Sequence, residues 1–111
     1  VRLVEQQQDR DAITEFRKSL YLAPYDAQTH LALGRVLVRA ARLREAAETL
    51  KVSLWSAESV EARLLLAEAL LGAGEVTEAL PHAERALQLA PASAEARALL
   101  DRIRSTPAPV P

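Results

Sequence analysis

The side chains best suited to chemistry in this sequence are two histidines and one pair of arginines. His30 and His82 are far apart in the chain, and the sequence has no cysteine, no HExxH motif and no glycine-rich phosphate loop. A catalytic or structural zinc site needs three or four protein ligands, so we do not expect one here. Arg35 and Arg39 are four residues apart, which places them on one face of a helix. Together they could hold a carboxylate or a phosphate.

Each of these side chains also has a purely structural interpretation. His30 can be a partly buried packing residue, and His82 can be a surface residue of a helix. The two arginines can pair with Glu61 or Glu68 of a neighbouring helix, or remain solvated. The many carboxylates are typical of amphipathic helices, where they form solvated faces and pairs with nearby basic residues. We therefore predict a segment that is not an enzyme and that uses no metal or other cofactor.

The composition indicates helices and excludes several classes of protein. Half of the 111 residues are hydrophobic, mostly alanine and leucine, whereas only four are aromatic. Alanine and leucine are strong helix formers and poor strand formers. A net charge of −1 lacks the basic footprint of a nucleic-acid-binding protein. No apolar stretch is long enough for membrane insertion. The bias towards alanine, leucine and arginine indicates a bacterial source, while the compartment is not predicted. The start at Val1 indicates a processed end or an artificial boundary.

A repeating unit organises the chain. The related pentapeptides LYLAP (20–24), LWSAE (54–58) and LQLAP (87–91) recur at nearly equal intervals, the second interval being shorter by a single position. Internal periods of about 34 residues are typical of stacked repeat proteins. The missing position lies directly after LWSAE, which has also lost its proline. Two further series keep the same register: Ala12, Ala46 and Ala79, and Leu33, Leu66 and Leu100.

Each unit is predicted to contain two helices. Apolar residues recur at intervals of three and four after residue 30 and again after residue 45, with a turn near residues 39–42. A third unit has its turn at Gly72–Gly74. Asp26, Ser59 and Ser93 occupy positions where an N-cap side chain would accept helix amides. Pro24 and Pro91 end the preceding helices.

We predict one all-α domain over residues 1–104. Its units lie at about 1–24, 25–58 and 59–91, followed by a capping helix at 93–104. The first unit is incomplete: Val1–Gln6 is expected to be the tail of a first helix, and Arg10–Leu22 a second helix. The sequence STPAPVP at 105–111 is expected to be an extended tail or linker because of its three prolines.

This pattern resembles the tetratricopeptide repeat family. Leu33-Gly34 matches the leucine–glycine pair of that family, and the resemblance covers about residues 1–104. Small or polar residues replace several of the family's aromatic and alanine positions, at His30, Arg63, Arg97, Leu37, Leu70, Ser19 and Ser53. The later part of the family pattern is matched by Gly74, Ala79, Ala83, Ala86, Leu87 and Pro91 in the third unit, and by Ala12, Phe16, Leu20 and Pro24 in the first.

The resemblance implies a right-handed α-solenoid of antiparallel helix pairs. It would comprise about two full repeats, a partial N-terminal repeat and the capping helix, with the first helix of each pair lining a concave groove. Ligands of the family most often lie in that groove, and a chaperone-binding subclass grips a peptide carboxylate there with lysines and asparagines. This chain has no asparagine, and its two lysines lie on second helices, which disfavours that subclass. The corresponding groove positions here are Gln28, Leu31, Arg35, Arg39, Glu61, Leu64, Glu68, Leu71, Glu95, Ala98 and Arg102.

Tyr21 and Trp55 form a second candidate surface. They are one repeat apart, at equivalent positions of successive second helices, where the third unit has Gln88. Aromatic residues at a repeated position can form an exposed seam for a partner. The alternative is that they pack against the neighbouring loop.

Three functional hypotheses follow. The first is a protein–protein interaction module that binds a peptide or protein segment in the concave groove. The second is a structural spacer or oligomerisation element, in which the N-terminal edge near Leu3 and Val4 is covered by further repeats or by a second copy. The third is an accessory repeat region of a larger multidomain enzyme.

Overall fold

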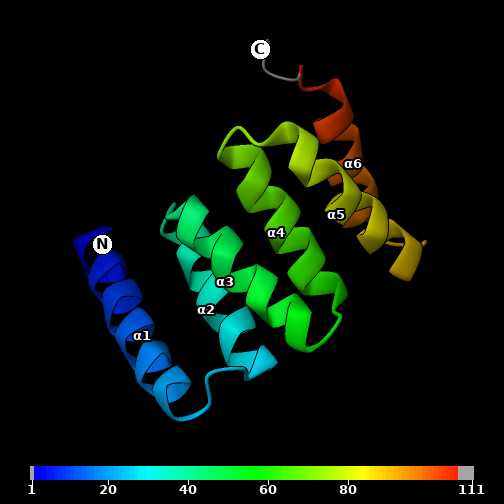
Figure 1. Cartoon of the computed structure of the whole chain (residues 1–111). Helices are drawn as coiled ribbons and strands as arrows, with labels where there is room; N and C mark the ends of the chain where they lie inside the picture. The colour runs from blue at the N-terminus through cyan, green and yellow to red at the C-terminus, as the bar shows by residue number, and fades with distance from the viewer. Residues whose placement is uncertain (1, 108–111) are drawn as a thin grey trace.

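The protein is a single stack of antiparallel helices (Figure 1). The computed structural model describes residues 2–107, and these contain no β-strand. The all-α solenoid predicted from the sequence is therefore confirmed, whereas the last four residues of the predicted tail lie outside the described residues. No described helix is long and apolar enough to cross a bilayer. The six helices are α1 (Arg2–Leu22), α2 (Ala27–Arg39), α3 (Leu43–Ser56), α4 (Val60–Gly72), α5 (Val76–Leu89) and α6 (Ala94–Ser105).

The predicted caps set the starts of α2, α4 and α6. The carboxylate of Asp26 accepts the backbone amides two and three residues later. The hydroxyls of Ser59 and Ser93 each accept the amide three residues later, at 3.1 and 3.0 Å. These bonds satisfy amides that have no partner inside the helix. The three caps named from the sequence are confirmed.

The first helix differs from the prediction. The sequence analysis expected a helix tail at Val1–Gln6 and a separate helix from Arg10, but α1 is continuous from Arg2 to Leu22. The intervening glutamine, aspartate and arginine residues include no glycine or proline that would end a helix. The side chain of Gln7 also donates to Asp11 one turn later, at 3.0 Å. The expected break was therefore wrong, and the first unit contributes one long helix.

The stack is tighter along one side than along the other. Helix α2 packs on α4, and α4 packs on α6, whereas among the described residues the backbones of α1, α3 and α5 do not touch one another. Long side chains span those wider gaps instead: Arg17 reaches Glu45 and Lys51 reaches Glu78, both at 2.9 Å. A stack that is shorter along the line of α2, α4 and α6 curves towards that line. These helices therefore form its inner face.

Close packing within a helix pair depends on Gly34. A Cβ atom placed on Gly34 would lie 2.5 Å from Cδ2 and 2.6 Å from Cγ of Leu50. Both residues are buried, and Leu50 has no exposed surface. Only a glycine lets α2 and α3 approach this closely, which explains the leucine–glycine pair in the sequence pattern.

The turns within the two complete pairs share a backbone conformation but differ in residue type. Ala41 has φ 60° in the α2–α3 turn, and Gly74 has φ 84° in the α4–α5 turn. In the left-handed region an L-residue is disfavoured by about 1–2 kcal/mol, whereas glycine is not. No atom lies within 4 Å of a Cβ placed on Gly74, so substitution there tests the backbone alone.

We expect reciprocal effects from exchanging these two turn residues. Ala41→Gly should raise the free energy of unfolding by about 0.5–1 kcal/mol because it relieves the strained turn. Gly74→Ala should lower it by about 1 kcal/mol for the opposite reason. Urea unfolding followed by circular dichroism measures both, and a change of the same sign in the two variants would contradict this account.

We expect Gly34→Ala to destabilise the protein by about 1–2 kcal/mol, because the overlap with Leu50 outweighs the higher helix propensity of alanine. Gly72→Ala is the matched control. Its Cβ would meet only the terminal Cδ1 of the half-buried Leu43, at 2.7 Å, which can rotate away. Equal thermal midpoints for the two variants would exclude the proposed crossing constraint.

Candidate interaction surface

The inner face carries most of the residues predicted for the groove. Gln28, Arg35, Arg39, Glu61, Glu68, Glu95, Ala98 and Arg102 are exposed on α2, α4 and α6, and Leu71 is half-buried. Leu31 and Leu64 are the exceptions, with only 6% and 8% of their surface exposed. They belong to the core because α2 and α4 each have neighbours on both sides. Assigning these two leucines to ligand contact was therefore wrong.

Arg35 and Arg39 do not act together. Arg35 bonds to Glu61 on α4, with Nη2 at 2.7 Å and Nε at 2.8 Å from Oε2. Arg39 bonds to Asp9 on α1 through Nε at 3.0 Å and Nη2 at 2.6 Å. Each guanidinium thus ties α2 to a different neighbour. Of the alternatives considered for Arg35, the structure shows the pairing with Glu61.

Within the described residues, the inner face carries two unpaired glutamates, one on α4 and one on α6. In repeat register, Arg35 corresponds to Glu68, and Glu61 corresponds to Glu95. Where α2 and α4 form an ion pair, the equivalent positions on α4 and α6 are therefore both glutamates. Among residues 2–107, neither glutamate has a basic partner within ion-pair distance, and neither does Arg102 on α6 have an acidic one. These exposed charges remain available to a ligand.

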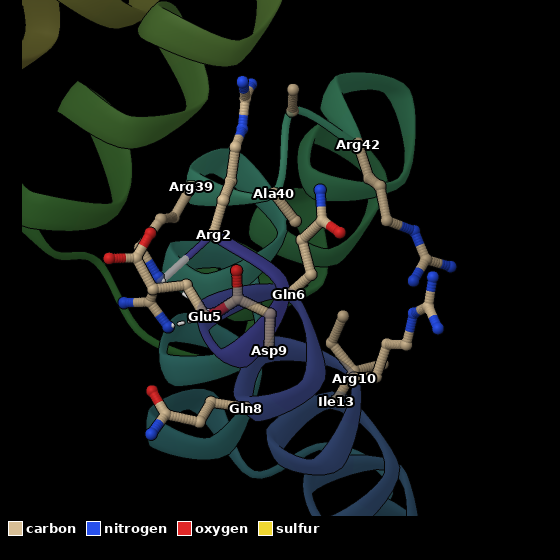
Figure 2. A pocket seen from close by; sticks show the side chains of 11 residues that line it. Arg2, Glu5, Gln6, Gln8, Asp9, Arg10, Ile13, Arg39, Ala40 and Arg42 are labelled. Carbon is tan, nitrogen blue, oxygen red and sulfur yellow. Dashed lines mark hydrogen bonds and ion pairs between the residues drawn. The ribbon is translucent and has the colours of Figure 1, made fainter.

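A cavity of about 710 Å³ borders this face at its N-terminal end. It lies between the first turns of α1 and the α2–α3 turn. Figure 2 shows the Arg39–Asp9 pair beside it, with the side chains of Arg10 and Arg42 extending to one side. Eight of its eleven lining residues are polar or charged, and the full set is Arg2, Glu5, Gln6, Gln8, Asp9, Arg10, Ile13, Arg39, Ala40, Ala41 and Arg42.

The cavity follows from a substitution in the repeat pattern. In the second unit, Leu43 at the start of α3 packs against Gly72 at the end of α4. The corresponding residues one unit earlier are Asp9 and Arg39, so an ion pair takes the place of an apolar contact. The longer, polar pair leaves space between the helices that the leucine fills elsewhere. Sequence analysis named Arg39 but missed Asp9, although the register of Leu43 locates it.

The short junction between α3 and α4 is organised by Glu58. Only three residues, 57–59, separate these helices, whereas four separate α1 from α2 and α5 from α6. Glu58 accepts two bonds from Arg63, at 2.9 and 3.0 Å, and one from the backbone amide of Ser59 at 3.1 Å. Arg85 of α5 lies 3.5 Å away. The charged carboxylate thus replaces the proline found at the other two junctions.

These partners lower the pKa of Glu58 from 4.5 to about 2, chiefly through the hydrogen bonds from Arg63. Arg63 also donates to Nδ1 of His82 at 2.9 Å. Burial, followed by the charge of Arg63, lowers the pKa of His82 below 6.5. His82 was expected on the surface, but it is half-buried in this network. His30 is half-buried, as expected, and bonds to the Pro24 carbonyl at 2.7 Å.

The aromatic candidates lie on the edge formed by the junctions. Tyr21 and Trp55 are exposed near the ends of α1 and α3. The ring of Trp55 meets that of Tyr25, in the α1–α2 junction, edge to face with centroids 5.5 Å apart. Trp55 therefore packs on a loop residue and still faces solvent.

Within residues 2–107, no three histidine or carboxylate side chains are grouped as a metal site requires.

We expect Glu58→Gln to lower the free energy of unfolding at pH 7 by about 1 kcal/mol. The pKa shift alone corresponds to about 3 kcal/mol, but the side chain is 38% exposed, so solvent screening reduces the effect. A depressed carboxylate pKa stabilises the fold above pH 4.5, and this contribution disappears as the pH falls to about 2. Urea unfolding at several pH values measures it. Glu15→Gln, at an exposed pair on α1, is the control, and equal losses in both variants would exclude the junction network.

Comparison with known proteins supports the repeat assignment. The tetratricopeptide repeat family model matches residues 60–104, which span α4 to α6. The search of curated proteins found no match.

Solved structures of tetratricopeptide repeat proteins share the whole described fold. The domain of Arabidopsis OM64 superposes with a TM-score of 0.85 at 17% identity, covering 94% of this chain and 87% of that one. The second such domain of human RPAP3, solved in complex with the HSP70 peptide SGPTIEEVD, gives 0.85 at 16% identity, covering 93% and 87%. A thermophilic protein of Thermus thermophilus gives 0.77 at 26% identity, covering 91% of this chain and 52% of that one. The chain therefore has the tetratricopeptide repeat fold, with a family repeat at residues 60–104, and the resemblance found in its sequence is confirmed.

Proposed function

We propose that this chain is a protein–protein interaction module that binds an extended segment of a partner across α2, α4 and α6. The carrying observation is the row of exposed polar and charged side chains at repeat-equivalent positions of these three helices. Equivalent positions on stacked helices recur at about 10 Å, which is the length of about three residues of an extended peptide. The RPAP3 domain, which shares this fold, was solved in complex with a peptide, and this supports a peptide or protein segment as the ligand.

The ligand that we propose differs in charge from the HSP70 peptide of that complex, which contains the acidic sequence EEVD. The chain has no asparagine, and its lysines, Lys18 and Lys51, lie on α1 and α3, away from the inner face. Arg35 is already neutralised by Glu61. Glu68 on α4 and Glu95 on α6 remain without basic partners among the described residues. We therefore propose a partner segment with basic or neutral side chains where it crosses α4 and α6.

Oligomerisation through the N-terminal edge of α1 has less support. Leu3 and Val4 are exposed on α1, but their neighbours Arg2, Glu5 and Gln6 are polar and also exposed. Two apolar residues in such a turn do not form the contiguous patch expected of a stable dimer interface. An accessory role within a larger protein would use the same inner face and needs no separate site.

A displayed library of random peptides, selected on the purified protein, tests the proposed groove. We expect selected peptides enriched in lysine or arginine, with binding weakened at least tenfold by Glu68→Lys, because the substitution reverses an unpaired charge on the inner face. Affinity is measured by isothermal titration calorimetry.

The matched control is Glu48→Lys, the same charge reversal at an exposed residue of α3 on the outer face. The affinity of this variant for the selected peptides should remain within a factor of two of that of the parent chain. Selected peptides that tolerate Glu68→Lys but are lost with Glu48→Lys would place the ligand on the outer face and overturn the proposal. Circular dichroism verifies that both variants keep the helical content of the parent.

A further inference from the structure

Three of the four aromatic side chains of this protein are exposed together on one edge. Tyr21, Tyr25 and Trp55 are 87%, 65% and 77% exposed, and Leu22 beside them is 86% exposed. Large aromatic residues are usually mostly buried, and an exposed group of them on a monomer commonly marks an interaction site. The fourth aromatic, Phe16, packs against the core in the usual way. We refer to Tyr21, Tyr25 and Trp55 as the aromatic edge.

The aromatic edge is held in place by its surroundings. The junction that carries Tyr25 is fixed by a bond from the amide of Asp26 to the carbonyl of Ala23, at 3.2 Å. Nε2–H of His30 donates to the carbonyl of Pro24, at 2.7 Å. Trp55 is then positioned by its edge-to-face contact with Tyr25. The rings of Tyr25 and Trp55 are therefore preorganised, which lowers the entropic cost of binding.

The chemistry of these rings favours a proline-rich ligand. Tyrosine and tryptophan each offer a flat apolar face together with one hydrogen-bond donor. A polyproline II segment offers the complement, because its prolines present apolar rings and its carbonyls have no internal partners. Exposed tyrosines and tryptophans are the usual lining of surfaces that bind such segments. A packed helix would instead favour aliphatic side chains at the contact.

The sequence itself contains such a segment, with prolines at 107, 109 and 111. It follows Ser105, the last residue of α6. Helix α6 starts at the junction edge and ends at the opposite edge (Figure 1). The length of α6 alone is about 18 Å, and α3 and α6 are separated by about two further helix spacings of roughly 10 Å each. Six residues of fully extended chain span at most about 21 Å, which is less than this separation and favours a contact between two copies over one within a copy.

We propose that the aromatic edge binds the proline-rich segment Thr106–Pro111 of a second copy of this chain. The aromatic edge of one copy would receive the segment that leaves the opposite edge of the next. The contact joins two different surfaces, so its symmetry does not limit it to dimers. It is separate from the inner face proposed above for partner binding, and either proposal can fail without the other.

The first test is a titration of the synthetic peptide STPAPVP, read by the fluorescence of Trp55, the only tryptophan. The host is the full chain with Pro107, Pro109 and Pro111 replaced by alanine, so that its own segment does not compete. We expect a saturable change with a dissociation constant of about 1 mM or tighter. Tyr25→Ala should weaken binding at least fivefold. Two control variants should leave it unchanged: Gln88→Ala, at the position of α5 that corresponds to Trp55 in the repeat, and Glu68→Lys on the inner face.

Two results of this titration would overturn the proposal. One is a signal that does not saturate up to about 10 mM peptide, well above the expected dissociation constant. The other is equal binding of the proline-free peptide STAAAVA, which would show nonspecific apolar contact.

The second test compares the full chain with its triple proline-to-alanine variant by sedimentation velocity at rising concentration. We expect concentration-dependent association of the parent chain and its loss in the variant. Association that is equal in both would show that the prolines are not needed for it and would overturn the role of the proline-rich segment. A parent chain that remains monomeric at millimolar concentration would also overturn it.

Discussion

The structure depends on a small residue where the two helices of a pair cross. Gly34 brings α2 against Leu50 of α3, and Ala67, at the equivalent position of α4, has no exposed surface. The close approach buries the leucines of both helices and sets the distance to the next pair. At the equivalent position of α6 stands Asp101, which is exposed. Arg97 and Arg104, on the same face of α6, are exposed as well, so this face is solvated as a capping helix requires.

Charged residues take over where the apolar pattern is interrupted. Asp9 and Arg39 replace the contact that Leu43 and Gly72 make one unit later. At the junction after α3, Glu58 stands in place of a proline. In both places charged side chains connect neighbouring helices, whereas the other units have an apolar contact or a proline at the equivalent position. Such pairs leave more space and more water than apolar contacts do, which accounts for the cavity beside α1.

Much of the fold could be predicted because the repeat makes each unit a control for the others. The register of Ala12, Ala46 and Ala79 located the helix pairs, and the short connection after LWSAE is the three-residue junction of the structure. The continuity of α1 was missed because its only comparison is with units that have a turn there. The residue types between Gln6 and Arg10 do not by themselves show whether the helix is interrupted there or continuous.

The candidate surface was predictable only in part. The register places Arg35, Glu61, Glu68 and Glu95 correctly on the inner face, but the partner of each arginine depends on side-chain reach across two helices. Asp9 and Arg39 lie on different helices, far apart in the chain, and nothing local marks the two as a pair. The burial of Leu31 and Leu64 likewise depends on how closely the neighbouring helices approach.

The unequal contact on the two sides of the stack also gives the protein a mechanical direction. The line of α2, α4 and α6 is joined by packed backbone and apolar side chains, which resist compression. The line of α1, α3 and α5 is joined across solvent by Arg17–Glu45, Lys51–Glu78 and Arg44–Glu75. Exposed ion pairs are weak and are screened by salt. The outer line is therefore held together less firmly than the inner one, and raising the ionic strength weakens its ion pairs further.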